Sequence, residues 1–145
     1  MRRSAVLLVL FVVGLVTAGP REDPVKKELR LFQGSWQALS AIRLDGKPLA
    51  ADQLKTTTIA IEGNKFTLRT RDDKITGTFS IDPTKKPKTM DGDFTFNGGT
   101  SGKFVGIYEI DGDRRRSCIN VAGTNRPTKM QQEGCISFEW KRQKP

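Results

Sequence analysis

The spacing of hydrophobic positions changes near residue 34, and this change divides the chain into a helix followed by strands. The apolar residues Val25, Leu29 and Phe32 fall on one helical face at positions i, i+4 and i+7. An Asp-Pro pair before them is typical of a helix start, and Gly34 is typical of a helix end. The pattern therefore predicts a helix over about residues 24–32.

Beyond Gly34 the apolar positions recur with a period of two, as in strands with one buried face. Strands are predicted over residues 35–44, 57–62, 65–69, 75–81, 88–96, 103–110, 114–121 and 135–142. The glycine-rich residues 98–102 are expected to form a flexible connection. Strands joined by turns favour antiparallel neighbours, and closure removes exposed edges. We expect an all-β fold, an eight-stranded antiparallel up-and-down barrel with a short N-terminal helix; an open sandwich is the alternative.

The lengths of the connections predict two different barrel ends, because alternate connections of an up-and-down barrel lie at the same end. Residues 63–64 and 111–113 form tight turns at the end that contains Trp36. The longest connections, residues 45–56 and 122–134, belong to the opposite end. This arrangement predicts a closed floor and a mouth that carries the long loops.

The start of the chain has the composition of a targeting segment rather than of a fold. Two arginines precede an apolar run of 12 residues, 5–16, and small or apolar residues then lead to Ala18. This pattern is typical of a signal peptide over residues 1–18, cleaved after Ala18, because a spanning helix needs ~20 apolar residues. We expect a secreted or periplasmic protein with one domain over residues 19–145 and no membrane span in the mature chain.

The net positive charge favours an anionic component of the cell envelope as a partner, and the basic runs do not favour nucleic acid. The whole chain has a net charge of +9, which becomes +7 without the two arginines of the signal. A basic secreted protein is suited to an anionic envelope component, such as a polymer or a lipid headgroup. The basic runs at 85–86 and 114–116 lack interleaved aromatic residues, so we do not expect nucleic acid as a partner.

Few residue types suited to catalysis or metal binding are present. The sequence has no histidine and two cysteines, which excludes Ser-His triads and four-ligand Cys/His zinc sites. The Asp-Gly-Asp runs at 91–93 and 111–113 lack the spaced oxygens of a calcium loop and match hairpin turns. We therefore predict a protein that is not an enzyme, with no catalytic residue, metal or cofactor.

Gly34 and Trp36 stand between the predicted helix and the first of eight strands, and this arrangement resembles the lipocalins. In that family the glycine permits the turn, the tryptophan lies across the closed floor, and an arginine from the end of the last strand packs on its ring. Here Arg142 follows Trp140 in the last strand. The resemblance implies that Trp36 is a buried plug with Arg142, before Arg115, on its ring, a contact worth ~0.5–2 kcal/mol.

Six motifs in order carry a closer resemblance over nearly all of residues 19–145. They are LFQGSW at 31–36, DGKP at 45–48, DPTKKPKTMD at 82–91, GIYEIDGD at 106–113, Cys118 and Arg126-Pro127. They are similar to the small secreted lipocalin-like domain found in many copies in planctomycete bacteria. That family has no established biochemical function, so the resemblance implies fold and compartment and transfers no catalytic residue. Arg115 and Ser117 depart from it, since the family usually has apolar residues there.

The interior of the predicted barrel has two interpretations. Its aromatic residues either line a ligand cavity or fill a packed core; they are Trp36, Phe66, Phe79, Phe104, Tyr108 and Phe138. If Ile119 faces inward, alternation turns Arg115 inward as well. An inward Arg115 anchors a ligand carboxylate or packs against Trp36 in the role of Arg142; a bulge that turns it outward is the third alternative.

Cys118 and Cys135 lie on the last two predicted strands, which are antiparallel neighbours. A register that places them opposite each other, with Arg115 opposite Phe138, turns both thiols outward. An oxidising compartment then favours a Cys118–Cys135 disulfide. Two free outward thiols are the alternative.

The leading interpretation is a secreted lipocalin-like protein that binds a small apolar or amphipathic ligand. The ligand would enter between the long loops, past Lys47, Arg126 and Lys129. The alternative is a cell-envelope interaction module with a packed core, which binds a protein or a polyanion through its basic surface. A connected interior void of ~300 Å³ or more favours the first, and a filled interior favours the second.

Overall fold

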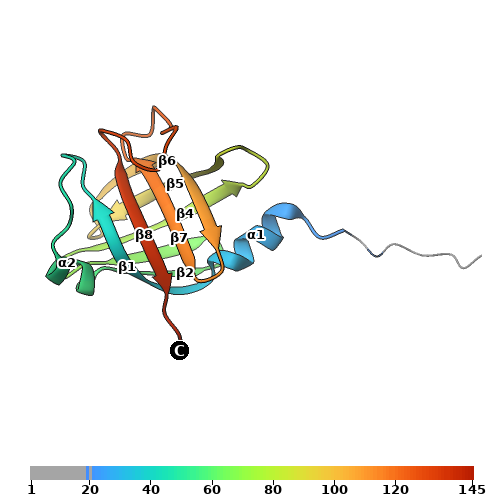
Figure 1. Cartoon of the computed structure of the whole chain (residues 1–145), viewed down its shortest axis with the longest axis horizontal. Coiled ribbons are helices and arrows are strands. Elements are labelled where there is room, and N and C mark those ends of the chain that lie inside the picture. Colours follow the sequence, from blue (N-terminus) through green and yellow to red (C-terminus); the bar gives the residue numbers. More distant parts are fainter. Residues whose placement is uncertain (1–18, 20) are drawn as a thin grey trace, which may run out of the picture.

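The computed structural model describes residue 19 and residues 21–145, and these residues form one closed antiparallel barrel preceded by a helix (Figure 1). The eight strands follow one another around the barrel in sequence order, and β8 pairs with β1. The predicted up-and-down barrel is therefore confirmed, and the open sandwich is wrong. The predicted signal peptide lies outside the described residues.

The observed bounds agree with most of the predicted elements. They are α1 (Pro24–Phe32), β1 (Gly34–Ile42), α2 (Ala51–Thr56), β2 (Thr58–Glu62), β3 (Lys65–Arg69), β4 (Lys74–Asp82), β5 (Lys88–Phe96), β6 (Thr100–Asp111), β7 (Arg114–Asn120) and β8 (Ile136–Arg142). Among the described residues, neither helix is long and apolar enough to cross a membrane.

Two differences from the predicted elements bear on the interior. The short helix α2 was not predicted; its Leu54 packs against the main core, and its Gln53 side chain accepts the backbone N–H of Ala50 at 3.2 Å. The prediction that residues 98–102 form a flexible connection is wrong, because β6 already begins at Thr100. Its first residues pair with the end of β5, with Gly102 opposite Phe94.

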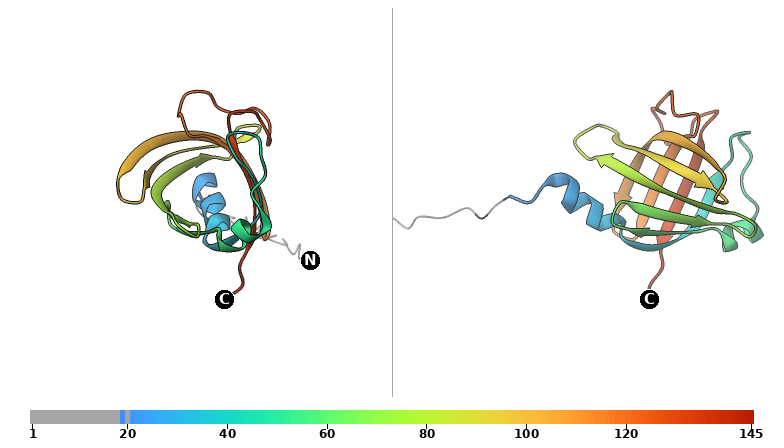
Figure 2. Two further views of the ribbon diagram at one scale, coloured as in Figure 1. Left: turned by 90° about the vertical axis from the view of Figure 1, so that its left-hand side faces the viewer. Right: turned by 180° about the vertical axis from the view of Figure 1, so that it is seen from behind.

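The first helix closes one end of the barrel. In the view along the barrel, α1 lies within the outline of the ring of strands (Figure 2, left). Its last residue, Phe32, is fully buried, and the Phe32 ring lies 5.0 Å from that of Tyr108 and 5.6 Å from that of Phe79. The apolar face predicted from the sequence period therefore packs into the barrel end.

The long loops lie at the opposite end, as predicted. Residues 42, 43, 45 and 46 line a small hollow there together with residues 131–133, so the two long connections lie side by side. The tight β2–β3 turn lies at the α1 end, where the Gly63 N–H donates to Gln33 Oε1 at 2.7 Å. The predicted placement of the tight turn and the long connections at opposite ends is confirmed.

Candidate ligand-binding cavity

Trp36 forms the centre of the barrel floor. Its side chain is fully buried, and its Nε1 donates to the Phe32 carbonyl oxygen at 2.8 Å. The guanidinium carbon of Arg142 lies 4.2 Å from the centroid of the indole ring, and that of Arg115 lies 5.0 Å from it. The predicted plug, with Arg142 closer than Arg115, is confirmed.

Arg142 holds the floor together by joining three elements. Its Nη1 and Nη2 donate to the carbonyl oxygens of Gln33 and Leu31 at the end of α1, and its Nε donates to Asp113 Oδ1 at 3.1 Å. Carbonyl groups at a helix C-terminus have no partner within the helix, so a cation there stabilises it. Gly34, with a φ of +103°, makes the turn beside this guanidinium.

A second polar contact fixes α1 to the strands. Glu28 accepts hydrogen bonds from Lys88 Nζ at 2.7 Å and from the Tyr108 hydroxyl at 3.2 Å. Burial, and then the charge of Glu28, raise the pKa of the Tyr108 hydroxyl. We name Phe32, Trp36, Tyr108, Trp140 and Arg142 the floor cluster.

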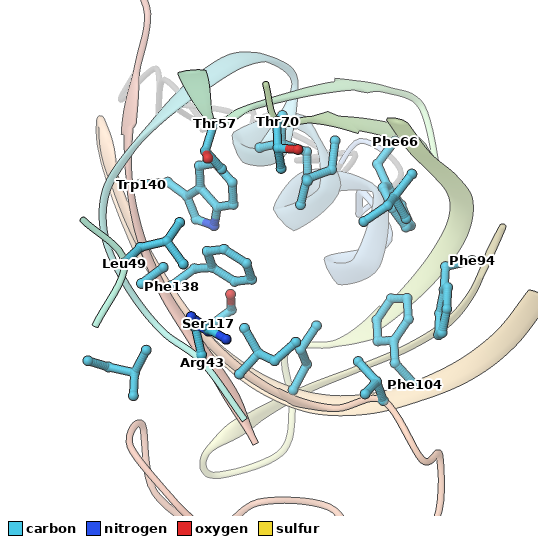
Figure 3. A pocket seen from close by; sticks show the side chains of 18 of the residues that line it. Arg43, Leu49, Thr57, Phe66, Thr70, Phe94, Phe104, Ser117, Phe138 and Trp140 are labelled. Atoms are coloured by element: carbon cyan, nitrogen blue, oxygen red, sulfur yellow. The ribbon is translucent and has the colours of Figure 1, made fainter. Parts of the chain in front are cut away.

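Above the floor cluster the barrel encloses a cavity of about 660 Å³ (Figure 3). In that view Phe66, Phe94 and Phe104 lie on one wall and Phe138 and Trp140 on the other. The volume exceeds the ~300 Å³ at which an interior becomes able to hold a small ligand. The interior is therefore not filled by its own side chains.

Glycines in the strands explain why the aromatic residues line this space without filling it. Three rings lie against a glycine of the next strand; the pairs are Phe66 with Gly77, Phe104 with Gly92, and Phe94 with Gly102. A Cβ atom at these glycines would lie 2.8, 2.5 and 2.7 Å from the Cζ atom of the facing ring. Each ring occupies the place of the missing side chain, and we name these pairs the ring-on-glycine wall.

The opening of the cavity combines apolar and charged side chains. Leu44 and Phe96 line it, and they are 47% and 40% exposed. The charged residues that line the same end are Arg43, Asp45 and Asp73. This rim suits an amphipathic molecule better than a fully polar one.

Arg115 faces inward near the floor and also lines the cavity. Its side chain is 3% exposed, and β7 pairs with both neighbours without a bulge, so the outward alternative is wrong. Its guanidinium carbon lies 5.3 Å from the Phe32 ring centroid and 5.6 Å from that of Trp140. Burial, and then the charge of Arg142, lower the pKa of Arg115 to about 9.

The residues predicted for the mouth do not line the cavity. Lys47 and Lys129 are exposed and lie outside its lining. Arg126 lies on the outer side of the barrel wall: it donates to the Gly106 carbonyl oxygen at 2.8 Å and pairs with Asp91 at 2.6 Å. The prediction of a mouth formed by these residues needs correction, because the loop 122–134 folds along the wall.

The predicted register of the last two strands is wrong by two residues. Cys118 lies opposite Ser137, and Arg115 lies opposite Trp140. Cys118 and Cys135 are both free thiols in the structure, so it does not contain the predicted disulfide. They lie on the outer side of the wall, as predicted, but are buried in a cluster that includes Met130 of the covering loop.

The described residues do not form a metal centre. Over the part of the chain that the structure describes, no group of three or more Asp, Glu or Cys side chains is placed to hold a metal. In comparisons with known proteins, the chain matches no protein-family model and no curated protein.

Proposed function

We propose that the protein binds a small apolar or amphipathic molecule inside the barrel. The observation that carries this proposal is the cavity of about 660 Å³, whose lining is almost entirely apolar. Binding sites for small molecules have volumes of ~300–1,000 Å³, apolar walls and a few placed polar groups. The cavity has this composition, with aromatic rings on its walls and Arg115 near its base.

The ring-on-glycine wall supports binding over packing. A protein that uses its barrel only as a scaffold gains stability when its interior is filled, because empty volume forfeits contacts between atoms. Here Gly77, Gly92 and Gly102 hold three rings against the wall and keep the space open. This arrangement argues against the alternative module, whose core would be packed.

The exposed apolar rim indicates where a ligand enters. Leu44 and Phe96 lie at the end that carries the long loops, and α1 closes the other end. A ligand that enters here places its apolar part against the ring-on-glycine wall. Each CH₂ group that leaves water contributes ~0.8 kcal/mol, so affinity should rise with chain length until the cavity is full.

A titration with linear alcohols of 8 to 18 carbons tests the proposal. The protein is first stripped of bound lipid, and binding is followed by calorimetry and by tryptophan fluorescence, since Trp140 lines the cavity. We expect saturable binding of one molecule per chain, with affinity that increases with chain length. Failure of every alcohol to bind would contradict the proposal.

Two glycine variants show whether binding occurs inside the barrel. In Gly102→Ala the three atoms nearest to the new Cβ all belong to the Phe94 ring, so the ring should turn into the cavity and weaken binding. In Gly99→Ala the new Cβ lies 3.7 Å from the nearest atom, an ordinary contact, so binding should be unchanged. Equal effects of the two variants would place the alcohol outside the barrel.

A further inference from the structure

Arg115 is a buried cation for which the fold supplies no counter-charge. Its neighbours along β7 each meet a carboxylate: Arg114 pairs with Glu139 at 3.2 Å and Arg116 with Glu109 at 2.5 Å. No such pair is recorded for Arg115 within residues 21–145, although it is the most buried of the three. A buried charge without a partner is costly, so its position requires an explanation.

The unpartnered atoms of Arg115 are those that hold carboxylates. Nε and Nη2 are buried and have no acceptor in the described part of the chain. These two nitrogens form one edge of the guanidinium, and both donate in the same direction. Arg116 uses this same edge on Glu109, with Nε at 3.2 Å and Nη2 at 2.5 Å from Oε2.

A purely structural role for Arg115 leaves the unpaired edge of its guanidinium unexplained. The function of an arginine on the floor tryptophan already belongs to Arg142, which is closer to the ring and also binds three acceptors. Three aromatic rings surround Arg115 and attract its charge, but they provide no carboxylate or carbonyl acceptor for the Nε–H and Nη2–H groups. What a neutral residue cannot supply is a positive charge at the base of an apolar cavity.

We propose that the ligand is an aliphatic carboxylate and that Arg115 binds its carboxylate at the base of the cavity. This inference rests on the proposed function and specifies its ligand class. The apolar chain then runs along the ring-on-glycine wall and ends near Leu44 and Phe96 at the mouth.

The chemistry of Arg115 selects a carboxylate over other anions. A carboxylate is planar, carries one charge and accepts two parallel hydrogen bonds from one guanidinium edge. A phosphate monoester carries more charge at neutral pH than a single guanidinium neutralises. The adjustment required is a rotation of the guanidinium, which turns the enclosed Nε–Nη2 edge toward the adjoining cavity.

The test compares carboxylates with alcohols of equal chain length on three proteins, namely the wild type, Arg115→Met and Arg43→Met. Removing a charged hydrogen-bonding partner should weaken carboxylate binding by ~10–100-fold in Arg115→Met. Alcohol binding by the same variant should be nearly unchanged, which also shows that it is folded. Arg43 lines the exposed mouth and is the matched control, so Arg43→Met should weaken the carboxylates less than ~5-fold.

Each other result overturns a defined part of the proposal. If Arg115→Met binds carboxylates as the wild type does, the cavity still binds ligands but Arg115 is not the anchor. If Arg43→Met has the larger effect, the carboxylate lies at the mouth. If Arg115→Met loses acids and alcohols alike, its role is structural. If the wild type binds neither series, the proposed function fails, and this inference fails with it.

Discussion

The floor and the cavity are both built from aromatic side chains of one barrel, yet one is filled and the other is open. In the floor cluster, rings meet rings, and Arg142 satisfies the carbonyl groups where α1 ends. In the ring-on-glycine wall, each ring meets a glycine and lies back against the sheet. The residue opposite an aromatic side chain thus decides whether it fills a barrel or lines one.

The two inward arginines differ in the same way. Arg142 bonds to two carbonyl groups and a carboxylate, while Arg115 is more deeply buried and leaves one edge without an acceptor. The first stabilises the closed end. The second has the desolvation cost of a buried charge whose Nε–Nη2 edge has no acceptor among the described residues.

We expect the largest loss of stability from a substitution in the floor cluster. Trp36→Ala removes a fully buried indole together with its hydrogen bond to Phe32 and its contact with Arg142. Truncation of a large buried aromatic side chain costs ~3–5 kcal/mol, and we expect that loss in the free energy of unfolding measured with urea. A loss below ~1 kcal/mol would mean that the floor does not support the fold.

The floor was predicted better than the cavity, because the resemblance to the lipocalins implied the roles of Trp36 and Arg142 and the motif that carries the resemblance is local. Gly34 and Trp36 lie together at the junction of α1 and β1, and hydrophobic period places the strands to within a few residues. Arg115 was also correctly turned inward by alternation. The cavity depends on which glycine faces which ring, as with Gly102 and Phe94, and this pairing follows from register across strands.

Register also explains the incorrect predictions. The observed pairing of β7 with β8 is shifted by two residues from the predicted one, so that Cys118 lies opposite Ser137 and not Cys135. A shift of two residues leaves every side chain on the same face of the sheet, so the alternation of apolar residues cannot detect it. The path of the loop 122–134 depends on the contacts of Arg126 with β5, β6 and Asp91, which no local pattern encodes. The register of β7 against β8 and the path of the loop 122–134 therefore depend on long-range contacts, which the alternation of apolar residues does not determine.

The next largest effect distinguishes the two arginines, because we expect their substitutions to change the free energy of unfolding differently. Arg142→Met should lower the free energy of unfolding by ~1.5–3 kcal/mol, because charged hydrogen bonds are lost where α1 ends. Arg115→Met should leave it unchanged or raise it by ~1–4 kcal/mol, because a neutral side chain removes a buried charge. Urea unfolding of both variants, without ligand, measures the difference. Similar losses in both would make Arg115 a structural part of the floor.

A smaller effect should appear in the dependence of stability on pH. The pKa of Arg115 is lowered to about 9 in the folded protein and returns to its ordinary, higher value on unfolding. Below pH 9 the cation is present in both states, so its burial destabilises the fold fully; above pH 9 the folded protein releases the proton first, and stability rises. The charged group recorded beside it is Arg142, and the other contacts are the rings of Phe32, Trp36 and Trp140.

Urea unfolding of the wild type and Arg115→Met at pH 7, 8, 9 and 10 measures this dependence. Titration of the lysines and tyrosine is common to both proteins and cancels in the difference. The difference in free energy of unfolding between Arg115→Met and the wild type should be constant up to about pH 8 and become smaller above pH 9. A difference that stays constant to pH 10 would show that Arg115 keeps its proton.

The smallest effect concerns the outer side of the wall, where the structure predicts no response to ligand. Cys118 and Cys135 are buried under the loop 122–134 and face away from the cavity, and burial raises the pKa of the Cys135 thiol. Labelling of the folded protein should therefore be slow, and faster at Cys135, which precedes β8, than at Cys118 within β7.

Quantitative thiol labelling, with and without a saturating aliphatic alcohol, measures both rates. They should be the same in the two conditions, because a molecule in the cavity lies on the other side of β7 from Cys118. Unfolding without reductant should release two reactive thiols per chain. A count of zero would mean that the thiols are oxidised to a disulfide. Slower labelling on binding would mean that the loop and the cavity move together, and the wall would then not separate its two sides.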